Sequence, residues 1–262
     1  MTNPNDPPAL ELRGIDMHYG YVRALDGIDV QVRGGEVLGL LGDNGAGKST
    51  LLKVMSGVHR PTGGEILVHG APAQFTSPAD STAAGIQMVY QDLALVDAQD
   101  IATNLSLGRE ILRRGPLGWL GFVDHKAQRR RAAAELDRLG VRTAAVTRPV
   151  EMLSGGQRQV VALARGATRV TGERGGVLLL DEPTAALGYE QTEQVQQLIR
   201  RLAADGIALV LVTHNLPLAL AVCDRIAVLN RGRKVADVPA AETGNDELVG
   251  WITGARASMF AP

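Results

Sequence analysis

The amino-acid sequence predicts an α/β fold with a mainly parallel sheet and helices on both of its faces. Strand-like and helix-like segments alternate from "GVLLLD" onward, which is typical of βαβ units and of the parallel sheets that they build. An earlier stretch alternates apolar and polar residues with period two, which indicates an antiparallel β part near the N-terminus. A long stretch rich in helices and loops lies between these regions and indicates an inserted helical part.

The N-terminal part is predicted to hold strands on either side of one helix. Alternation over Leu10–Met17 and Ile28–Val32 predicts antiparallel strands, and a Gly34-Gly35 turn leads into the buried strand "EVLGLLG". "KSTLLKVMSGV" is typical of a helix, which Gly57 would end. "GGEILVHG" and "GIQMVYQ" are predicted to be two further strands.

The middle of the chain is predicted to be helical. "DAQDIATNLSLGRE" has helical spacing, and a loop interrupted by glycine and proline, "RRGPLGWLGFVD", follows it. A helix is expected over Asp124–Leu139, with Asp124 as its N-cap and Gly140 at its end. Its buried face is expected to contain Ala127, Ala132, Leu136 and Leu139.

These elements divide the chain into five expected parts. They are a disordered tail (1–9), a first core part (10–91), a helical part (92–170), a continuation of the core (171–240), and a C-terminal helix with a tail (241–262). A length of 262 residues suits one large domain or a core with a subdomain.

Composition limits the class of protein. The formal net charge is −1, with 27 basic and 28 acidic residues, which argues against a broad footprint for nucleic acid or for an anionic membrane. The basic run Arg129–Arg131 is expected to be the solvated face of a helix, with a nucleic-acid patch as the minor alternative. The start has no signal-peptide pattern and no apolar run is long enough for a bilayer, so we expect a cytoplasmic protein unless a partner holds it at a membrane. The one cysteine, Cys223, lies in an apolar run and is expected to be a buried thiol.

The sharpest motif is "GDNGAGKST", which follows a predicted buried strand and precedes a predicted helix. Gly-x4-Gly-Lys-Ser in this context is a P-loop, in which glycines let backbone N–H groups surround a phosphate at the start of a helix. The lysine would contact the β- and γ-phosphates, and the serine would ligate Mg²⁺. The sequence therefore predicts a nucleotide site formed by Gly42, Asp43, Asn44, Gly45, Ala46, Gly47, Lys48, Ser49 and Thr50.

Two adjacent carboxylates, Asp181 and Glu182, follow the apolar run "VLLL". A carboxylate at the C-terminal end of a core strand lies where α/β sheets bind ligands. Asp181 is expected to hold the Mg²⁺ shell, and Glu182 is expected to polarise or deprotonate the water that attacks the γ-phosphate. The alternative is an exposed turn with two solvated acids, and the P-loop in the same chain favours the functional interpretation.

A second glycine-containing motif, "LSGGQ", precedes a predicted helix. Ser154 is a plausible N-cap, and Gly155 and Gly156 would expose backbone donors beside Gln157 at the helix start, which indicates a second anion site. The motif alone is also compatible with a simple capped helix.

From about Leu10 to Val238 the chain resembles the nucleotide-binding subunit of an ABC transporter. The family's motifs occur in the family's order, and six in register are specific where each alone is modest. They are the aromatic residue Tyr19 in "HYG", Walker A (42–50), the Q-loop glutamine Gln91, the signature (153–157), Walker B (177–182) and the switch histidine His214.

The resemblance implies a head-to-tail dimer that holds two ATP molecules, with the P-loop of one subunit facing the signature of the other. It implies that Tyr19 stacks on adenine, that His214 bonds the γ-phosphate, and that Gln91 approaches both Mg²⁺ and the attacking water. The ordinary alternatives are a half-buried strand tyrosine, a hydrogen-bonded histidine at a strand end and a surface glutamine. The family's loop after Walker B commonly has an aspartate where this chain has Gly188, so we expect the backbone of 185–188 to couple the two sites.

The segment "VYQDLALVDAQDIATNLSLGRE" resembles single-cassette ATPases of bacterial monosaccharide importers of the ribose, xylose and fructose type. The implied partners are a second cassette, expected to be a second copy, transmembrane permease subunits and, indirectly, a sugar-binding protein. The implied location is the cytoplasmic face of the membrane. We expect the permease contact within 92–110, and the loop at Trp119 either joins that surface or packs on its own subdomain. The alternatives are an ABC ATPase for another solute, an ABC ATPase that acts on nucleic acid or the ribosome, and a nucleotide-gated dimerisation module without turnover.

Overall fold

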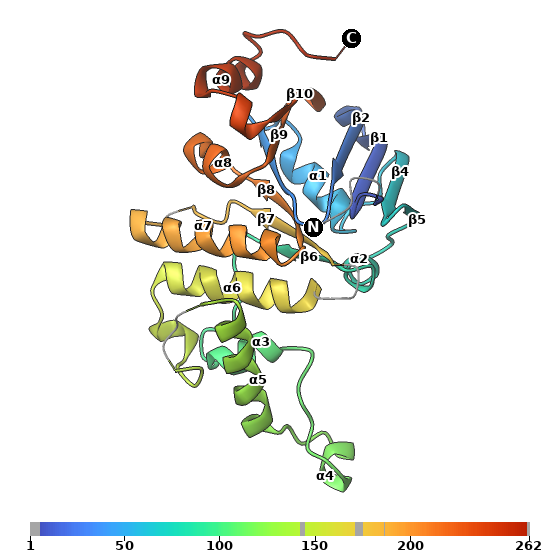
Figure 1. The fold of residues 1–262 in the computed structure, drawn as a ribbon. Coiled ribbons are helices and arrows are strands. Elements are labelled where there is room, and N and C mark those ends of the chain that lie inside the picture. The colour runs from blue at the N-terminus through green and yellow to red at the C-terminus, as the bar shows by residue number, and fades with distance from the viewer. Residues whose placement is uncertain (1–5, 142–144, 171–174, 186, 261–262) are drawn as a thin grey trace. The chain divides into compact units, whose positions relative to one another are not determined.

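The computed structural model describes residues 6–141, 145–170, 175–185 and 187–260. They form two compact units, which we call the core unit (1–91, 170–183 and 199–262) and the helical unit (92–169 and 184–198). Figure 1 labels most of the helices and strands of both. The segment 184–198 belongs to the helical unit, whereas the sequence had suggested that it continues the core.

A six-stranded sheet is the centre of the core unit, with the strand order β10-β9-β3-β8-β7-β6. Its five strands from β9 to β6 are parallel, and β10 adds an antiparallel edge. β3 and β8 are buried along their whole length, which explains their continuous apolar runs. The strands are β3 (Val37–Gly42), β6 (Ile86–Val89), β7 (Val177–Asp181), β8 (Ala208–Val212), β9 (Arg225–Asn230) and β10 (Arg233–Pro239).

A second, antiparallel sheet has the order β2-β1-β4-β5. Leu10 at the start of β1 pairs with Val32 on one side and with Val68 on the other. The alternating burial along β1 and β2 confirms the period-two prediction. The strands are β1 (Leu10–Tyr19), β2 (Val22–Val32), β4 (Gly63–Val68) and β5 (Ala71–Ala73).

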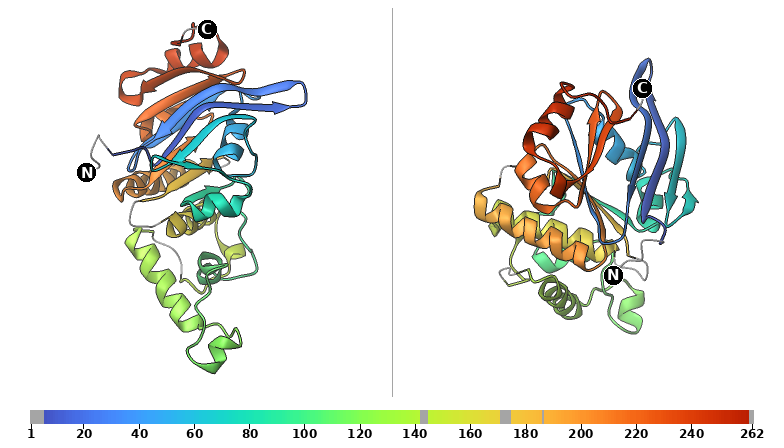
Figure 2. Two further views of the ribbon diagram at one scale, coloured as in Figure 1. Left: turned by 90° about the vertical axis from the view of Figure 1, so that its right-hand side faces the viewer. Right: turned by 45° about the horizontal axis from the view of Figure 1, so that its top comes forward.

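Helices complete the core unit. The predicted helix after the P-loop is α1, which contacts β2 of one sheet and β3 and β7 of the other, while α9 contacts β3 and β9 (Figure 2). Gly57 follows α1 with a φ of +72°, as the predicted end of that helix requires. The helices are α1 (Lys48–Met55), α2 (Pro78–Ala83), α8 (Leu216–Val222) and α9 (Asn245–Thr253), with a short η2 (Ala240–Glu242).

The core of this unit is apolar and shared by both sheets. Leu38 and Leu40 of β3, Leu52 of α1 and Leu10 and Ile15 of β1 are all fully buried in one cluster. Cys223 is also buried, as predicted, and burial raises the pKa of its thiol to about 12. No helix within the described residues is both long and apolar enough to span a bilayer.

The helical unit contains the predicted helix at 124–139 as α5. The Asp124 carboxylate accepts a hydrogen bond from the N–H of Ala127 at 2.9 Å, so the predicted N-cap is confirmed. The expected buried face is wrong at one position, because Ala127 is half-buried and Gln128 is buried in its place. The helices are α3 (Ile101–Ser106), α4 (Pro116–Trp119), α5 (His125–Arg138), η1 (Val150–Met152), α6 (Gly155–Val170) and the first part of α7 (Tyr189–Ala204).

Candidate nucleotide site

The strand register of the core unit brings four sequence motifs to one edge of the sheet. Val212, the last residue of β8, pairs with Leu40 of β3 and with Asp181 of β7. On the far side of β7, Leu180 pairs with Val89 at the end of β6. Because these strands are parallel, the P-loop, the segment after β8, the Walker B carboxylates and the Q-loop all leave the sheet at its carboxyl edge, where α/β sheets bind ligands.

Glycines of the P-loop are required for two different reasons. A Cβ on Gly42 would lie 2.4 Å from the carbonyl oxygen of Leu229, and one on Gly47 would lie 3.0 Å from that of Ala24, so both positions are closely packed. Gly45 has a φ of +78°, and a Cβ there would meet no other atom within 4 Å, so only its backbone conformation requires glycine. The loop is thus packed on one side and open at Gly45.

Lys48 is the first residue of α1 and lies across the loop. Its Nζ donates to the carbonyl oxygens of Gly42 at 2.8 Å and Asp43 at 3.0 Å. Burial lowers the pKa of the Lys48 ammonium, and the charges of Glu182, Asp43 and Asp181 oppose that shift by raising it. The charges of Asp181 and Glu182 therefore act on Lys48 in this structure.

The other polar groups of the loop are available at its surface. Ser49 is exposed in the first turn of α1, next to half-buried Thr50. The Asp43 carboxylate accepts from the N–H of Asn44 at 2.7 Å, and the N–H of Ala46 donates to the Asp43 carbonyl at 3.1 Å. These bonds close the turn without using the serine hydroxyl.

Asp181 is a half-buried carboxylate at the end of β7. Burial first, and then the charge of Glu182, raises the pKa of its carboxyl group, while Lys48 and Lys53 lower it. Asp181 forms no ion pair with any residue in the described ranges. Its anionic form therefore lacks a direct counterion in this structure, which suits a carboxylate that meets a cation.

Glu182 is held by the strand next to its own. Its N–H donates to the carbonyl of Val212 at 2.9 Å, and its backbone adopts a φ of +48°, which is uncommon for a non-glycine residue. One carboxylate oxygen accepts from the Thr213 hydroxyl at 3.2 Å, and the other lies 2.8 Å from Nδ1 of His214. The Glu182 carboxylate is mostly buried, whereas the His214 side chain is 76% exposed.

Sequence reasoning missed Thr213 as part of this group. It is fully buried, and its hydroxyl also accepts the N–H of Asn215 at 3.1 Å. Its one signal in the sequence was a hydroxyl at the end of the otherwise apolar run "IALVLVTH". That signal did not identify a partner, because Glu182 lies 31 residues away in the chain.

Gln91 and Tyr19 are less constrained. Gln91 is exposed two residues after the end of β6, and its side chain makes no hydrogen bond among the described residues. The Tyr19 ring is 42% exposed and packs edge-to-face on His59, with 5.6 Å between ring centroids. His59 was not singled out from the sequence. Adenine stacking by Tyr19 and a metal or water contact by Gln91 stay predictions.

The signature lies in the helical unit, at the start of α6. The Ser154 hydroxyl accepts from the N–H of Gln157 at 3.3 Å, and the Gln157 side chain accepts from the N–H of Ser154 at 3.0 Å. The predicted N-cap is confirmed, and Gln157 completes a reciprocal capping box that was not foreseen. The N–H groups of Gly155 and Gly156 are in the first turn, where a helix offers them no acceptor.

The start of α6 packs closely on α7. A Cβ on Gly156 would lie 2.3 Å from Cγ of Gln191, so a side chain here would displace the neighbouring helix. Further along α6, the Arg165 guanidinium donates to the carbonyls of Leu93 and Ala94, both at 2.8 Å. Ala94 has a φ of +50°, so this arginine fixes a strained segment shortly after the Q-loop glutamine.

The residues at this site suit a Mg²⁺ ion that is also bound by phosphate oxygens, and they do not suit a metal bound by protein groups alone. The described ranges contain no group of three His, Cys, Asp or Glu side chains that could bind a metal ion. Mg²⁺ at phosphate sites takes one or two protein oxygens together with phosphate oxygens and water. Asp181 without a counterion and the exposed Ser49 hydroxyl supply such oxygens.

The chain belongs to the ABC transporter family, whose family model matches residues 25–185. The fructose import ATP-binding protein FrcA of Rhizobium meliloti is 43% identical over 251 residues, which are 95% of each chain. The xylose/arabinose import ATP-binding protein XylG of Sulfolobus acidocaldarius is 39% identical over 93% of each chain. The ribose import ATP-binding protein RbsA 1 of Rubrobacter xylanophilus is 41% identical over 94% of this chain but 47% of its own length, so this chain spans about half of it.

Solved structures confirm the fold class. The ADP conformation of the ATP-binding cassette MJ1267 has a TM-score of 0.77 at 24% identity, covering 94% of this chain and 95% of that one. The cbiO1 protein of Clostridium perfringens, part of the ABC transporter complex cbiONQ, has a TM-score of 0.75 at 27% identity and covers 96% of both chains. A dimeric post-hydrolysis state of the cassette MJ0796, bound to ADP and Pi, has a TM-score of 0.70 at 24% identity and covers 89% and 100%.

Proposed function

We propose that the chain is the ATP-hydrolysing subunit of an ABC importer and that the solute is a monosaccharide. The observation that carries the first half is the arrangement at the carboxyl edge of the sheet, where Lys48, Asp181 and Glu182 lie within one electrostatic group. The second half rests on the names of relatives at about 40% identity, which are import ATP-binding proteins for fructose, ribose, xylose and arabinose.

Lys48 binds the β- and γ-phosphates in this proposal. Its ammonium group donates to two loop carbonyls, and phosphate oxygens would offer stronger, charged acceptors in their place. The N–H groups of the first turn of α1 lack acceptors within the helix and would donate to the same anion. The open space at Gly45 leaves the loop accessible to the phosphates.

Ser49 and Asp181 would hold Mg²⁺, with Gln91 as a further oxygen donor. Mg²⁺ neutralises charge that develops on the β- and γ-phosphates. Binding of a cation beside Asp181 also removes the electrostatic cost that raises the pKa of this carboxyl group.

Glu182 orients the attacking water and accepts its proton. The Thr213 hydroxyl and the His214 ring engage opposite oxygens of its carboxylate, which fixes the plane of the group. The exposed ring of His214 reaches the γ-phosphate with its free edge, and the exposed ring of Tyr19 stacks on adenine. Each of these roles is general acid–base or positioning chemistry, which side chains of this kind can perform.

The second anion site at the start of α6 serves a second ATP-bound cassette. The N–H groups of Gly155 and Gly156 lack acceptors within the helix, and the helix dipole favours an anion beside them. We propose a dimer of two copies, in which each signature faces the P-loop of the partner. The dimeric state of the cassette MJ0796 supports the dimer in this proposal. The permease would bind within 92–110 at the cytoplasmic face of the membrane, with a sugar-binding protein as its indirect partner.

ATP turnover of the purified chain tests the proposal. Lys48→Ala should abolish ATP binding and turnover, whereas Lys126→Ala, which removes a lysine of the helical unit, should leave both unchanged. Co-purification from membranes with a multi-span permease, followed by ATP-driven uptake of labelled monosaccharides in vesicles, tests the import half. Uptake of a solute of another class would contradict the proposal that the solute is a monosaccharide. Recovery of the chain with ribosomes or DNA alone would contradict the proposal that it acts in transport.

A further inference from the structure

Residues 111–123 form a closed loop between α3 and α5 of the helical unit. Leu112 and Val123 form a β-bridge at its base, where the N–H of Arg113 donates to the Phe122 carbonyl at 2.8 Å. The N–H of Asp124 donates to the Ile111 carbonyl at 2.6 Å directly below this bridge. Figure 1 shows that α4, at the tip of the loop, lies beyond the first turn of α5.

The tip of the loop is packed on itself. The N–H of Trp119 donates to the Gly115 carbonyl at 3.3 Å, and the N–H of Phe122 donates to the Leu117 carbonyl at 3.0 Å. Gly118 is buried, and a Cβ there would lie 1.7 Å from the Arg113 carbonyl oxygen. The loop is thus a preformed structure, and ordering it would add little to the cost of binding.

This tip exposes apolar side chains that its own unit does not cover. Trp119 is 90% exposed, Leu120 65% and Phe122 53%, and Leu112 and Leu117 are also exposed. The ordinary alternative from the sequence, in which Trp119 packs on its own subdomain, is therefore wrong. A cluster of this kind marks an interaction site, whereas scattered single exposed residues would not.

Basic side chains flank the apolar tip. The segment 109–131 contains seven basic and two acidic residues, although the whole chain has a net charge of −1. Both acids are engaged, since Asp124 caps α5 and Glu110 accepts the N–H of Gly108 at 2.9 Å. The exposed side chains of Arg113, Arg114, Lys126 and Arg130 form no ion pair with the described part of the chain.

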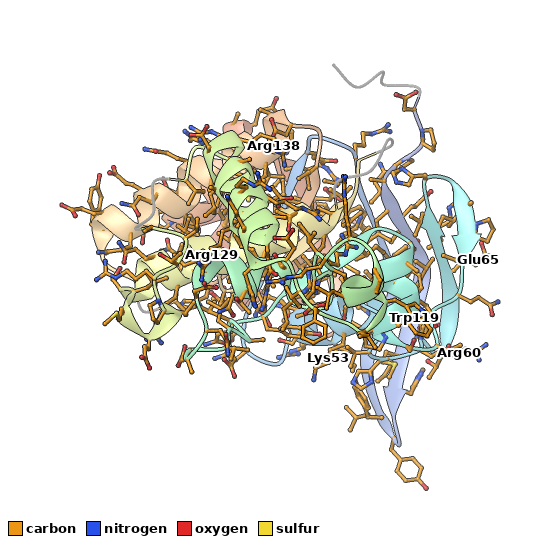
Figure 3. All side chains as sticks on the ribbon, turned by 90° about the horizontal axis from the view of Figure 1, so that it is seen from below. Lys53, Arg60, Glu65, Trp119, Arg129 and Arg138 are labelled. Carbon is orange, nitrogen blue, oxygen red and sulfur yellow. The ribbon has the colours of Figure 1, made fainter. Side chains whose placement is uncertain are left out.

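We infer that the loop 111–123 and its basic flanks contact an anionic phospholipid surface. Trp119, Leu120 and Phe122 enter the headgroup region, where tryptophan is favoured, and Arg113 and Arg114 pair with lipid phosphates. The charge of the segment is complementary to an anionic leaflet. Figure 3 labels Trp119 of the loop and, well apart from it in this view, Arg129 of α5. The net charge of the whole chain, −1, does not reveal this local basic region. The inference goes beyond the proposed ATPase and is tested without it.

Trp119 supplies its own spectroscopic probe. The chain has two tryptophans, and Trp251 is only 4% exposed, with the Arg256 guanidinium stacked on its ring. The full chain is mixed with vesicles of phosphatidylcholine, with or without phosphatidylglycerol. Anionic vesicles should shift the emission to shorter wavelength and sediment with the protein, and salt should weaken both effects. Trp119→Phe should lose the spectral shift but still sediment.

Matched variants identify the surface. Trp119→Ser should lower sedimentation with anionic vesicles about tenfold. Arg113→Gln combined with Arg114→Gln should lower it about tenfold and reduce its salt dependence. Tyr21→Ser, which removes a fully exposed aromatic ring from the β1–β2 turn, and Arg60→Gln should change nothing. Equal melting temperatures and equal ATP binding would show that the loop variants are folded.

Two results would overturn the inference. One is the absence of binding to anionic vesicles at low ionic strength, or binding that Trp119→Ser does not weaken. The other is a lipid-free complex with the permease in detergent that Trp119→Ser dissociates, because the loop would then be covered by protein.

Discussion

Nδ1 of His214 lies 2.8 Å from Oε1 of Glu182, although the two residues are 32 positions apart in the chain. The contact follows from the pairing of Asp181 with Val212, because each residue lies just beyond the end of one of these two parallel strands. The Thr213 hydroxyl engages the other carboxylate oxygen. Glu182, which we propose as the general base, is therefore oriented by residues that follow β8 and not by residues near it in sequence.

Thr213→Val should slow ATP turnover about tenfold and leave the KM for ATP nearly unchanged. The isosteric change removes the hydroxyl that orients Glu182 but leaves Lys48 and the P-loop intact. Thr213→Ser should restore most of the activity, because it keeps the hydroxyl. Steady-state kinetics check this, and equal activity of the valine and wild-type proteins would contradict the positioning role.

Asp181→Asn should raise the melting temperature of the nucleotide-free protein by roughly 2 °C at neutral pH while it removes Mg²⁺-dependent turnover. Burial and Glu182 raise the pKa of this carboxyl group, so folding disfavours its charged form. The wild-type protein then loses stability as pH rises from the ordinary carboxyl pKa through the raised one. The advantage of the asparagine variant should shrink below about pH 4. Melting curves from about pH 3 to pH 8 measure this difference, and a lower melting temperature for the variant at neutral pH would argue against the electrostatic account.

Gly39→Ala should destabilise the protein by about 1–3 kcal/mol, because its Cβ would lie 2.9 Å from Sγ of Cys223. Adding Cys223→Ala should recover most of that loss, since the nearest remaining side-chain atom is Cγ1 of Ile226 at 3.4 Å. Denaturant unfolding of both single variants and the double variant gives the coupling energy. Additive effects would mean that the β3 glycine is needed for some other reason.

Gly188→Asp should stabilise the protein by a few tenths of a kcal/mol. The Gly188 carbonyl accepts the N–H of Thr192 at 3.0 Å, so this glycine is the N-cap of α7, where aspartate is a better residue. Its Cβ would need only the flexible end of Gln191 to move. The same change tests the expectation that the backbone of 185–188 couples the two sites, although Ala186 lies outside the described residues. Unchanged stability, ATPase cooperativity and transport would contradict both expectations.

The sequence predicted the motifs and local caps well, because their physical signals are local. The Asp124 cap and the Ser154 cap each depend on residues within a few positions, and the glycine at Gly45 depends only on its own backbone conformation. The partners Thr213 and His59 were missed because strand register and tertiary packing create them. Gln128 replaced Ala127 in the buried face of α5, where its side-chain Nε2 lies 3.4 Å from the Ala102 carbonyl oxygen, and helical periodicity cannot foresee such a buried polar contact.

The exposed tip at Trp119 is a second feature that the sequence alone did not predict. Its residues are adjacent in sequence, but their exposure depends on the backbone bonds that fold 111–123 onto itself. The net charge of the whole chain also gave no indication of the basic segment around this tip. Local composition and three-dimensional exposure together were needed to distinguish a binding tip from a solvated loop.

Single-turnover hydrolysis by Glu182→Gln tests the central claim most directly. The variant should bind ATP as the wild-type protein does, because Lys48 and the P-loop are untouched, and it should accumulate an ATP-bound dimer. Its conversion of bound ATP to ADP should fall at least about a hundredfold. Hydrolysis at the wild-type rate would contradict the assignment of Glu182 as the base, and failure of ATP to stabilise a dimer would contradict the proposed two-copy site.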